Sequence, residues 1–415
     1  SSLVGSEMCI RDRHILSGAK LIAHHPNLYA VYLTNHGCGP DTMLSHLFKQ
    51  EMGDKPYLQI EVDEHFSNVG VITRIEAFLN SLNHRPVEVL PKDFVLEQVE
   101  IHPCHLPAVP EKDFPLWLPP LGEYTASLTG YFRAQGVDAH ALPHLGAHAL
   151  SLGRAETGAK EYLPFPALLG GILAQQEADP APAQFLIPQT QGAEADGQYA
   201  RVIRAVLDRR KEQNAQLISP MLETLPEMAQ NCDALFRALL AGDILYAAPA
   251  DKRADISAQW DALPGWEQLH TAAREIGALP AKGRRIAAVG TPLCLTELDS
   301  GVLSTLEAEG SQLLRAPLSE ALWFLWKDNM DANKPCAKWL EQMAQEMQTI
   351  GAELGAHSTF AQDTAALFET ADTILPHFAG GNGRYRYAKA VELSGRADAV
   401  LTLAPRYENA ATILD

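Results

Sequence analysis

The chain has 415 residues, of which 47% are hydrophobic and 20% charged, and its formal net charge at pH 7 is −18. A surface this acidic does not neutralise phosphates, so we expect neither nucleic acid nor an anionic membrane as a partner. No apolar run reaches the ~20 residues that a membrane span needs. The six cysteines form no Cys-x-x-Cys pair, so we expect a cytoplasmic protein without a disulfide framework or a zinc knuckle.

Both ends of the sequence have unusual features. Residues 1–13, SSLVGSEMCIRDR, begin without methionine and have no signal-peptide apolar stretch and no helical or strand period. We interpret them, Cys9 included, as a non-native leader outside the fold. The last residues, Ile413–Asp415, interrupt the start of a predicted helix. We therefore expect the sequence to be a fragment of a longer protein.

Residues 14–90 alternate between strand-like and helix-like patterns. Apolar runs at Ala30–Leu33 and Tyr57–Val62 predict strands, and helical spacing at Thr42–Glu51 and Val71–Leu82 predicts helices. Strands that alternate with helices over short loops favour a parallel α/β sheet. We expect this part to be the C-terminal portion of a first α/β lobe.

A proline-rich stretch follows, with prolines at positions 91, 103, 107, 110 and 115. Few helices or central strands accommodate so many prolines, so residues 91–118 are predicted to be a linker. Beyond it we predict a second lobe, with one α/β subdomain over 119–245 and another over 246–415. Its predicted helices are Ser127–Gln135, Tyr199–Asp208 and Asn231–Leu240, and its predicted strands are Phe185–Ile187, Arg285–Val289, Gln312–Arg315 and Ala399–Leu403.

An internal similarity connects the two ends of the chain. Residues 19–44 align without a gap with residues 388–413, and both lead from a helix-like pattern through a polar turn into an apolar strand and another helix start. Few identities support the alignment, so chance is one interpretation and duplication of a lobe is the other. In the alignment Cys38 falls on Tyr407.

The densest motif lies at residues 34–78, TNHGCGPDTMLSHLFKQEMGDKPYLQIEVDEHFSNVGVITRIEAF. A GCGPD turn, a strand with an acidic end and a T-R-x-E-A-F helix follow one another there. This run resembles the large proteins related to 2-hydroxyacyl-CoA dehydratases and their activases. Residues 119–143, 154–173 and 185–199 are similar to further segments of that family. The resemblance implies an α/β fold with repeated Rossmann-like parallel-sheet subdomains in two related lobes, the first of them incomplete here.

The same resemblance implies a chemistry. Family members hold a 4Fe-4S cluster between subdomains through cysteines at strand ends. In the dehydratases an ATP-driven activase injects one electron, and the hydroxyl group of a 2-hydroxyacyl thioester is then expelled. The chain is thus expected to belong to an iron–sulfur protein linked to ATP-dependent electron transfer or reductive dehydration of an acyl-CoA. Its actin-like ATPase domain would be a missing or separate part, and ATP would bind only there.

The second lobe departs from the family at the positions of its cysteines. The family carries sulfur at three positions where this chain has Tyr162, residues 190–193, and Tyr407 with Glu408. A cubane cluster needs about four ligands, mostly thiolates, and carboxylates or phenols do not replace sulfur on soft iron sites. We therefore expect the second lobe to bind no cluster.

Cys38 is the one metal-ligand candidate that remains. Its flanking glycines allow close approach of the backbone, and a turn at the carboxyl end of a strand is where open α/β sheets bind ligands. The alternative is a buried cysteine that fills a tight turn. Its cluster partners would lie mostly outside this chain, because the other cysteines of the fold, Cys104, Cys232, Cys294 and Cys336, lack ligand spacing and are interpreted as structural.

Polar residues at expected strand ends and helix starts supply the other candidates. The run Glu61–His65 suits a hard metal ion or acid–base chemistry, although a solvated rim is the simpler interpretation. Arg74 is a candidate for a CoA phosphate, with an Arg–Glu pair on one helix face as the alternative. The full set of substrate or lobe-interface candidates is Asp41, Glu61, Asp63, Glu64, Arg74, Glu76, Lys160, Glu161, Gln189 and Glu194.

A glycine-rich run, Gly380–Gly383, is the last motif. Gly381 and Gly383 are candidates for a phosphate loop at a helix start, and an ordinary loop is the alternative. No catalytic residue is assigned. Two other functions stay open besides the dehydratase-related one: a cluster-free scaffold or interaction module with the same fold, and a nucleotide-binding regulatory module that uses this loop.

Overall fold

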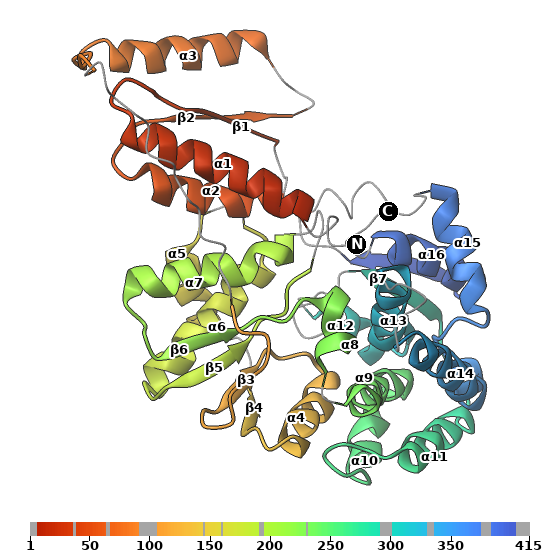
Figure 1. Ribbon diagram of the computed structural model, residues 1–415. Helices are drawn as coiled ribbons and strands as arrows, with labels where there is room; N and C mark the ends of the chain where they lie inside the picture. The colour runs from red at the N-terminus through yellow and green to blue at the C-terminus, as the bar shows by residue number, and fades with distance from the viewer. Residues whose placement is uncertain are drawn as a thin grey trace.

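The computed structural model describes residues 6–35, 39–63, 67–90, 106–143, 146–158, 161–190, 195–229, 231–290, 301–329, 336–374 and 383–403. Every strand pair in these ranges is parallel, and the strands form three separate sheets with helices packed around them (Figure 1). The predicted α/β class with parallel sheets is confirmed. Among the helices so described, none is both long enough and apolar enough to cross a membrane.

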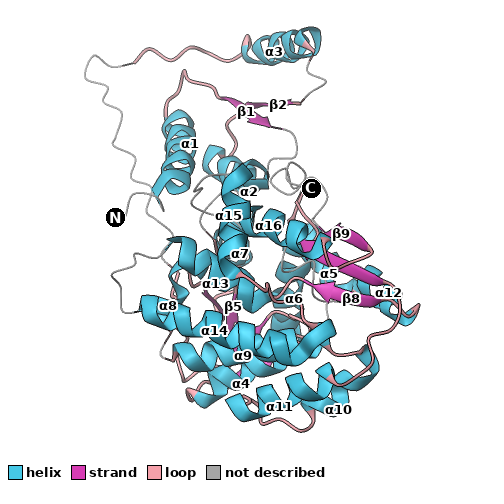
Figure 2. Ribbon diagram, turned by 90° about the vertical axis from the view of Figure 1, so that its right-hand side faces the viewer, coloured by secondary structure: helices cyan, strands magenta, loops and turns pink. Residues whose placement is uncertain are grey.

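The first sheet has two strands, β1 (Val31–Asn35) and β2 (Leu58–Val62). Helices α1 (Ser6–His24) and α2 (Gly39–Met52) lie on one side of it, and α3 (Asn68–Leu82) lies on the other (Figure 1). Tyr32 of β1 stacks on Phe48 of α2 with ring centroids 4.4 Å apart. Figure 2 shows the same sheet with α3 standing away from the helices of the main body.

Helix α1 begins earlier in the chain than the sequence pattern predicts. Residues 6–13, interpreted as lying outside the fold, form the first turns of α1. The helix is anchored further along by buried Leu16 and Ala19, and helical hydrogen bonding extends from that anchor toward the N-terminus. The C-terminal end of α1 is capped by the Lys55 ammonium group, which donates to the carbonyls of Ile22 and His25.

The second sheet has the order β4-β3-β5-β6. Its strands are β3 (Leu116–Leu118), β4 (Ala139–Ala141), β5 (Ala183–Leu186) and β6 (Ala215–Ile218). The helices that follow its strands in the chain are α4 (Tyr124–Ala134), α5 (Ala147–Glu156), α6 (Pro164–Ala178) and α7 (Tyr199–Arg210). A short 3₁₀ turn, η1 (Ala195–Gln198), precedes α7.

Strand β3 lies inside the predicted linker 91–118, so the linker does not extend to residue 118. The prolines flank this three-residue strand rather than interrupt it, and the Pro115 carbonyl accepts a hydrogen bond from the Gln184 backbone (2.8 Å). The Gln184 side chain, fully buried, donates to the carbonyls of Glu111 and Phe114. Residues 106–118 are therefore packed against the sheet.

The third sheet has the order β8-β7-β9, formed by β7 (Arg285–Gly290), β8 (Gln312–Arg315) and β9 (Ala399–Leu403). Helix α9 (Cys232–Ala247) connects this part to the second sheet. The remaining helices are α8 (Leu225–Met228), α10 (Arg253–Ser257), α11 (Trp266–Gly277), α12 (Val302–Ala308), α13 (Leu318–Asn329), α14 (Cys336–Leu354), α15 (Thr364–Ile374) and α16 (Gly383–Ser394).

Two hydrophobic cores hold these parts together. One contains side chains of α1, α2 and β1 together with those of α6, α7 and β5, so the first sheet's helices share a core with the second sheet. The other contains α4 and β3 together with α9, α13 and the third sheet. The second sheet therefore packs against a different neighbour on each of its two sides.

Candidate functional site

The order of the second sheet defines a switch point between β3 and β5. Strand β4 lies on one side of β3, whereas β5 and β6 lie on the other, so the connections leave these two central strands in opposite directions. In open α/β sheets, ligands bind at the carboxyl ends of the strands at such a point. Here those ends continue into Pro119 after β3 and into Ile187 and Pro188 after β5.

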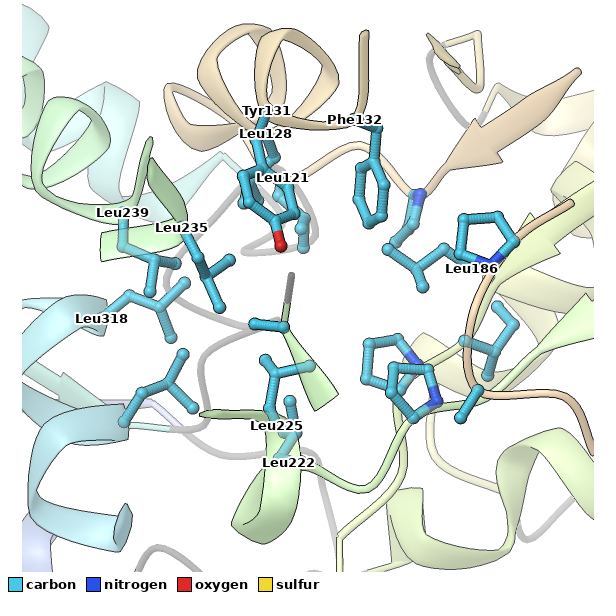
Figure 3. A pocket seen from close by; sticks show the side chains of 18 of the residues that line it. Leu121, Leu128, Tyr131, Phe132, Leu186, Leu222, Leu225, Leu235, Leu239 and Leu318 are labelled. Atoms are coloured by element: carbon cyan, nitrogen blue, oxygen red, sulfur yellow. The ribbon is translucent and has the colours of Figure 1, made fainter. Parts of the chain in front are cut away.

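A cavity of about 210 Å³ lies at this switch point. Its walls come from the strand ends, from α4 and α9, from the first turn of α13 and from residues 108–110 and 220–229 (Figure 3). Apolar cavities of about 150 Å³ already hold one benzene ring, so this one has room for a ring or a short chain. Its labelled apolar residues in Figure 3 are Leu121, Leu128, Phe132, Leu186, Leu222, Leu225, Leu235, Leu239 and Leu318.

The cavity contains few polar groups. Asp196 of η1 lines it, and its Oδ1 accepts a hydrogen bond from Thr190 Oγ1 (2.7 Å). Burial raises the pKa of the Asp196 carboxyl group, partly offset by hydrogen bonds from Thr190 and from backbone N–H groups. The Tyr131 hydroxyl group points into the cavity (Figure 3), and burial raises its pKa as well. Gln135 and Tyr199 also line the cavity, so its polar groups are one carboxyl, two phenols and one amide in an apolar setting.

The wall formed by α13 is fixed by a buried carboxylate. Asp243 of α9 accepts the backbone N–H of Leu318 (2.8 Å) and of Ser319 (3.1 Å), and its Oδ1 accepts the Tyr124 hydroxyl (2.5 Å). Asp243 thus caps the N-terminus of α13 from a neighbouring helix. Burial raises its pKa to about 6, against the opposing effect of these hydrogen bonds.

The predicted site residue Gln189 directly follows Pro188, which lines the cavity, but does not line it itself. Its backbone N–H donates to the Pro220 carbonyl (3.0 Å), and its side-chain amide donates to the Ser219 carbonyl (3.1 Å). Gln189 therefore joins the chain after β5 to the chain after β6. It supports the floor of the site from outside.

Glu161 lies where the first and second sheets meet. Its carboxylate contacts His46 Nε2 of α2, and its side chain is almost fully buried. Burial alone would raise the pKa of Glu161, but the hydrogen bond and charge of His46 bring it below its usual value. Glu161 does not line the cavity.

The candidates on the first sheet are distant in the fold from the cavity and are not grouped with it. Asp41 Oδ2 accepts the backbone N–H of Asn35 (3.3 Å), which links the first turn of α2 to the end of β1. Glu61 lies in β2 in register with Thr34, and Asp63 follows the strand. Arg74 and Glu76 are exposed on α3, where no residue is buried.

Several candidates lie outside the described residues, namely Cys38, Glu64, Lys160, Glu194 and Gly381. Gly383 is the first residue of α16. The Cys232 thiol donates to the Pro226 carbonyl (3.2 Å). Across the part of the chain that is described, no three His, Cys, Asp or Glu side chains are grouped to hold a metal ion.

Asp196 and Tyr131 were not predicted from the sequence. The signal for Asp196 is a carboxylate shortly after the predicted strand Phe185–Ile187, within the segment 185–199 that is similar to the dehydratase-related family. Its significance depends on β3 and β5 being neighbours, and β3 is a three-residue strand between prolines. Tyr131 occurs within a predicted helix, where nothing in the helical pattern separates a cavity-lining residue from a core residue.

The fold and the cavity define an α/β protein of parallel sheets with a small, mostly apolar site at a topological switch point. Comparison of the chain with protein-family models, with curated proteins and with solved structures found no significant match.

Proposed function

We propose that the cavity between β3 and β5 binds the acyl part of a small thioester, and that the chain belongs to an acyl-CoA dehydratase/activase-related protein. The observation that carries the proposal is the position of a mostly apolar cavity at the switch point, in which Asp196 is the one charged side chain among the described lining residues. The motif at residues 34–78 and the segments after 119 supply the link to that family.

The size and lining of the cavity fit an acyl group better than a whole coenzyme. A volume of about 210 Å³ is below the range of ~300–1,000 Å³ of pockets that enclose drug-sized ligands. The coenzyme part would lie outside, where the protein's net charge of −18 gives its phosphates little attraction. Binding free energy would therefore come mainly from burial of the acyl chain.

The described residues of the second lobe do not fit an iron–sulfur cluster. Tyr162 is buried in the core shared with α6, and Thr190 is engaged with Asp196, so neither position of a family cysteine offers a ligand. In the proposal this lobe positions substrate, and no chemical step passes through a cluster held by it. Reductive dehydration and its ATP-driven electron supply would depend on parts beyond these residues, in the cytoplasm.

A duplicated lobe is part of the proposal. In the alignment of 19–44 with 388–413, His24 corresponds to Leu393, and α1 and α16 end at His24 and Ser394. Val31 corresponds to Val400, and the strands β1 and β9 begin at Val31 and Ala399. Ala19 and Ala388, aligned with each other, are both buried. In the alignment, the two helices end within one residue of each other and the two strands begin within one residue of each other. This agreement supports a common origin of the two helix–strand units.

The test uses a neutral thioester, hexanoyl-N-acetylcysteamine, because it presents the acyl chain without coenzyme phosphates. Isothermal titration calorimetry is expected to detect binding to the unaltered protein. Two substitutions should weaken it at least tenfold: Val109→Trp at the exposed edge of the cavity and Ala321→Phe in its buried wall. Val302→Trp is the matched control, because Val302 is 42% exposed against 49% for Val109 but lies on α12 and does not line the cavity.

Equal binding by the unaltered protein and both cavity variants would overturn the proposal, as would no binding at all. Either result in a folded protein, shown by an unchanged circular dichroism spectrum, would favour the cluster-free scaffold instead.

A further inference from the structure

Among the described residues that line the cavity at the switch point, one is acidic and none is basic. Its lining includes one carboxyl group, Asp196, and the neutral polar side chains of Tyr131, Gln135 and Tyr199. None of the described residues that line it is a lysine, an arginine or a histidine. A negatively charged end of a ligand would therefore find no cation with which to pair.

Two physical effects act together on such a ligand. An ionised carboxylate that enters the cavity loses its hydration, and burial of an unpaired charge is strongly unfavourable. It would also lie close to the Asp196 carboxyl group, and two carboxylates that share a site cannot both ionise without a large cost. An uncharged or positively charged end meets neither obstacle, and a hydroxyl or ammonium end can donate a hydrogen bond to Asp196.

Asp196 is held in place rather than free to turn away. Its Oδ1 accepts the Thr190 hydroxyl at 2.7 Å, and backbone N–H groups of its own turn also bind the carboxyl group. Thr190 is itself buried, and it directly follows Gln189, whose main chain and side chain are bonded to the chain after β6. These hydrogen bonds restrict rotation of the Asp196 carboxyl group at the cavity that Asp196 lines.

We propose that this cavity accepts acyl chains with an uncharged or cationic end and rejects those with a terminal carboxylate, and that Asp196 is the residue that determines this specificity. The inference rests on the proposed function, because it concerns the acyl group that the same cavity would bind. It narrows the substrate class to monocarboxylic, hydroxy or amino acyl thioesters, as opposed to dicarboxylic ones.

The experiment compares three N-acetylcysteamine thioesters of equal chain length at pH 7.5, with hexanoyl, 6-aminohexanoyl and 5-carboxypentanoyl groups. Calorimetry with the unaltered protein should give at least tenfold weaker binding for the carboxylate-ended chain than for the hexanoyl chain. The variant Asp196→Asn keeps the shape of the side chain and an acceptor for Thr190. In it, the 6-aminohexanoyl chain should lose at least tenfold in affinity, and the penalty on the carboxylate-ended chain should shrink.

Asp251→Asn is the control, since Asp251 is exposed on the 3₁₀ turn Ala250–Lys252 and does not line the cavity. It should leave all three affinities unchanged. Binding of the carboxylate-ended chain as tightly as the hexanoyl chain would overturn the specificity and leave the proposed function standing. So would unchanged preferences in Asp196→Asn. Failure of all three chains to bind would overturn the proposed function itself.

Discussion

Asp243 joins three helices through a single carboxyl group. It belongs to α9, accepts the Tyr124 hydroxyl from α4, and caps α13 through the N–H groups of Leu318 and Ser319. Tyr385 of α16 also lies close enough for the charge of Asp243 to raise its pKa. Because α13 forms one wall of the cavity, ionisation of Asp243 is expected to affect both the free energy of unfolding and the position of that wall.

The free energy of unfolding should therefore carry a pH dependence that belongs to Asp243. Its pKa is about 6 in the folded protein and about 3.9 in an unfolded chain. Between these values the folded state binds the proton more tightly, so this contribution to stability is fully present below pH ~4 and is lost as pH rises through ~6. Two pKa units correspond to about 3 kcal/mol.

Urea unfolding at pH 4, 5, 6 and 7 would measure this, with Asp243→Asn as the variant that cannot titrate. The stability of the unaltered protein minus that of the variant should fall with rising pH by up to about 3 kcal/mol. A difference that stays constant over this range would show that Asp243 ionises as it does in water.

At the scale of elements, α5 and α6 pack with almost no space between their backbones. A Cβ atom on Gly170 would lie 1.7 Å from the Ala149 carbonyl oxygen, and one on Gly153 would lie 1.8 Å from the Pro166 carbonyl oxygen. Backbone atoms cannot rotate away as side chains do. The two helices therefore approach this closely only because both contact positions are glycine.

Gly170→Ala should destabilise the protein by about 2 kcal/mol despite the higher helix propensity of alanine, because overpacking costs about 1–3 kcal/mol. Gly18→Ala in α1 is the control, since a Cβ there meets nothing within 4 Å, and it should be neutral or stabilising by up to about 1 kcal/mol. Thermal unfolding of both variants distinguishes the effects. Equal stability of the two would contradict the packing argument.

Element patterns also show how far the sequence could predict this molecule. The strands predicted at Arg285–Val289 and Ala399–Leu403 correspond to β7 and β9, because continuous apolar residues are typical of parallel strands, although no residue of β9 is buried. β3 and β4 were missed because three residues are too few to show a period. The switch point needs β3, so the cavity could not be located from sequence, and Asp196 could not be separated from other carboxylates of its loop.

At the scale of the whole molecule, the junction between the first and second sheets has a polar contact within its shared core. Glu161 and His46 pair there with the Glu161 side chain 3% exposed. The lowered pKa of Glu161 means that its contribution to stability is present above pH ~4.3 and is lost as pH falls through the folded value. Removing one partner of a buried ion pair leaves the charge of the other partner buried and unpaired, which destabilises the fold.

Glu161→Gln should therefore loosen the first sheet from the second without unfolding the third. Hydrogen–deuterium exchange is expected to show at least about tenfold faster exchange in α1 and α2, and little change in α9 or β7. The matched control is Glu177→Gln, which removes the pair with His148 at 3.2 Å. Both partners of that pair are exposed, so its loss should have little effect. Uniform acceleration across the whole chain, or none in α1 and α2, would contradict this role.

In the third sheet the strand that comes first in the chain, β7, lies in the middle. This arrangement limits the order in which the strands can pair during folding. β7 pairs with β8 shortly after it in the chain, but its other edge pairs with Ala399–Leu403, which comes after α13, α14, α15 and α16. The second sheet needs no residue beyond Ile218 to complete its strand pairing. Closing the long loop between β8 and β9 has an entropic cost, and this cost is offset only when β9 pairs with β7. On the ribosome, the second sheet can thus complete its strand pairing well before the third sheet receives its final strand.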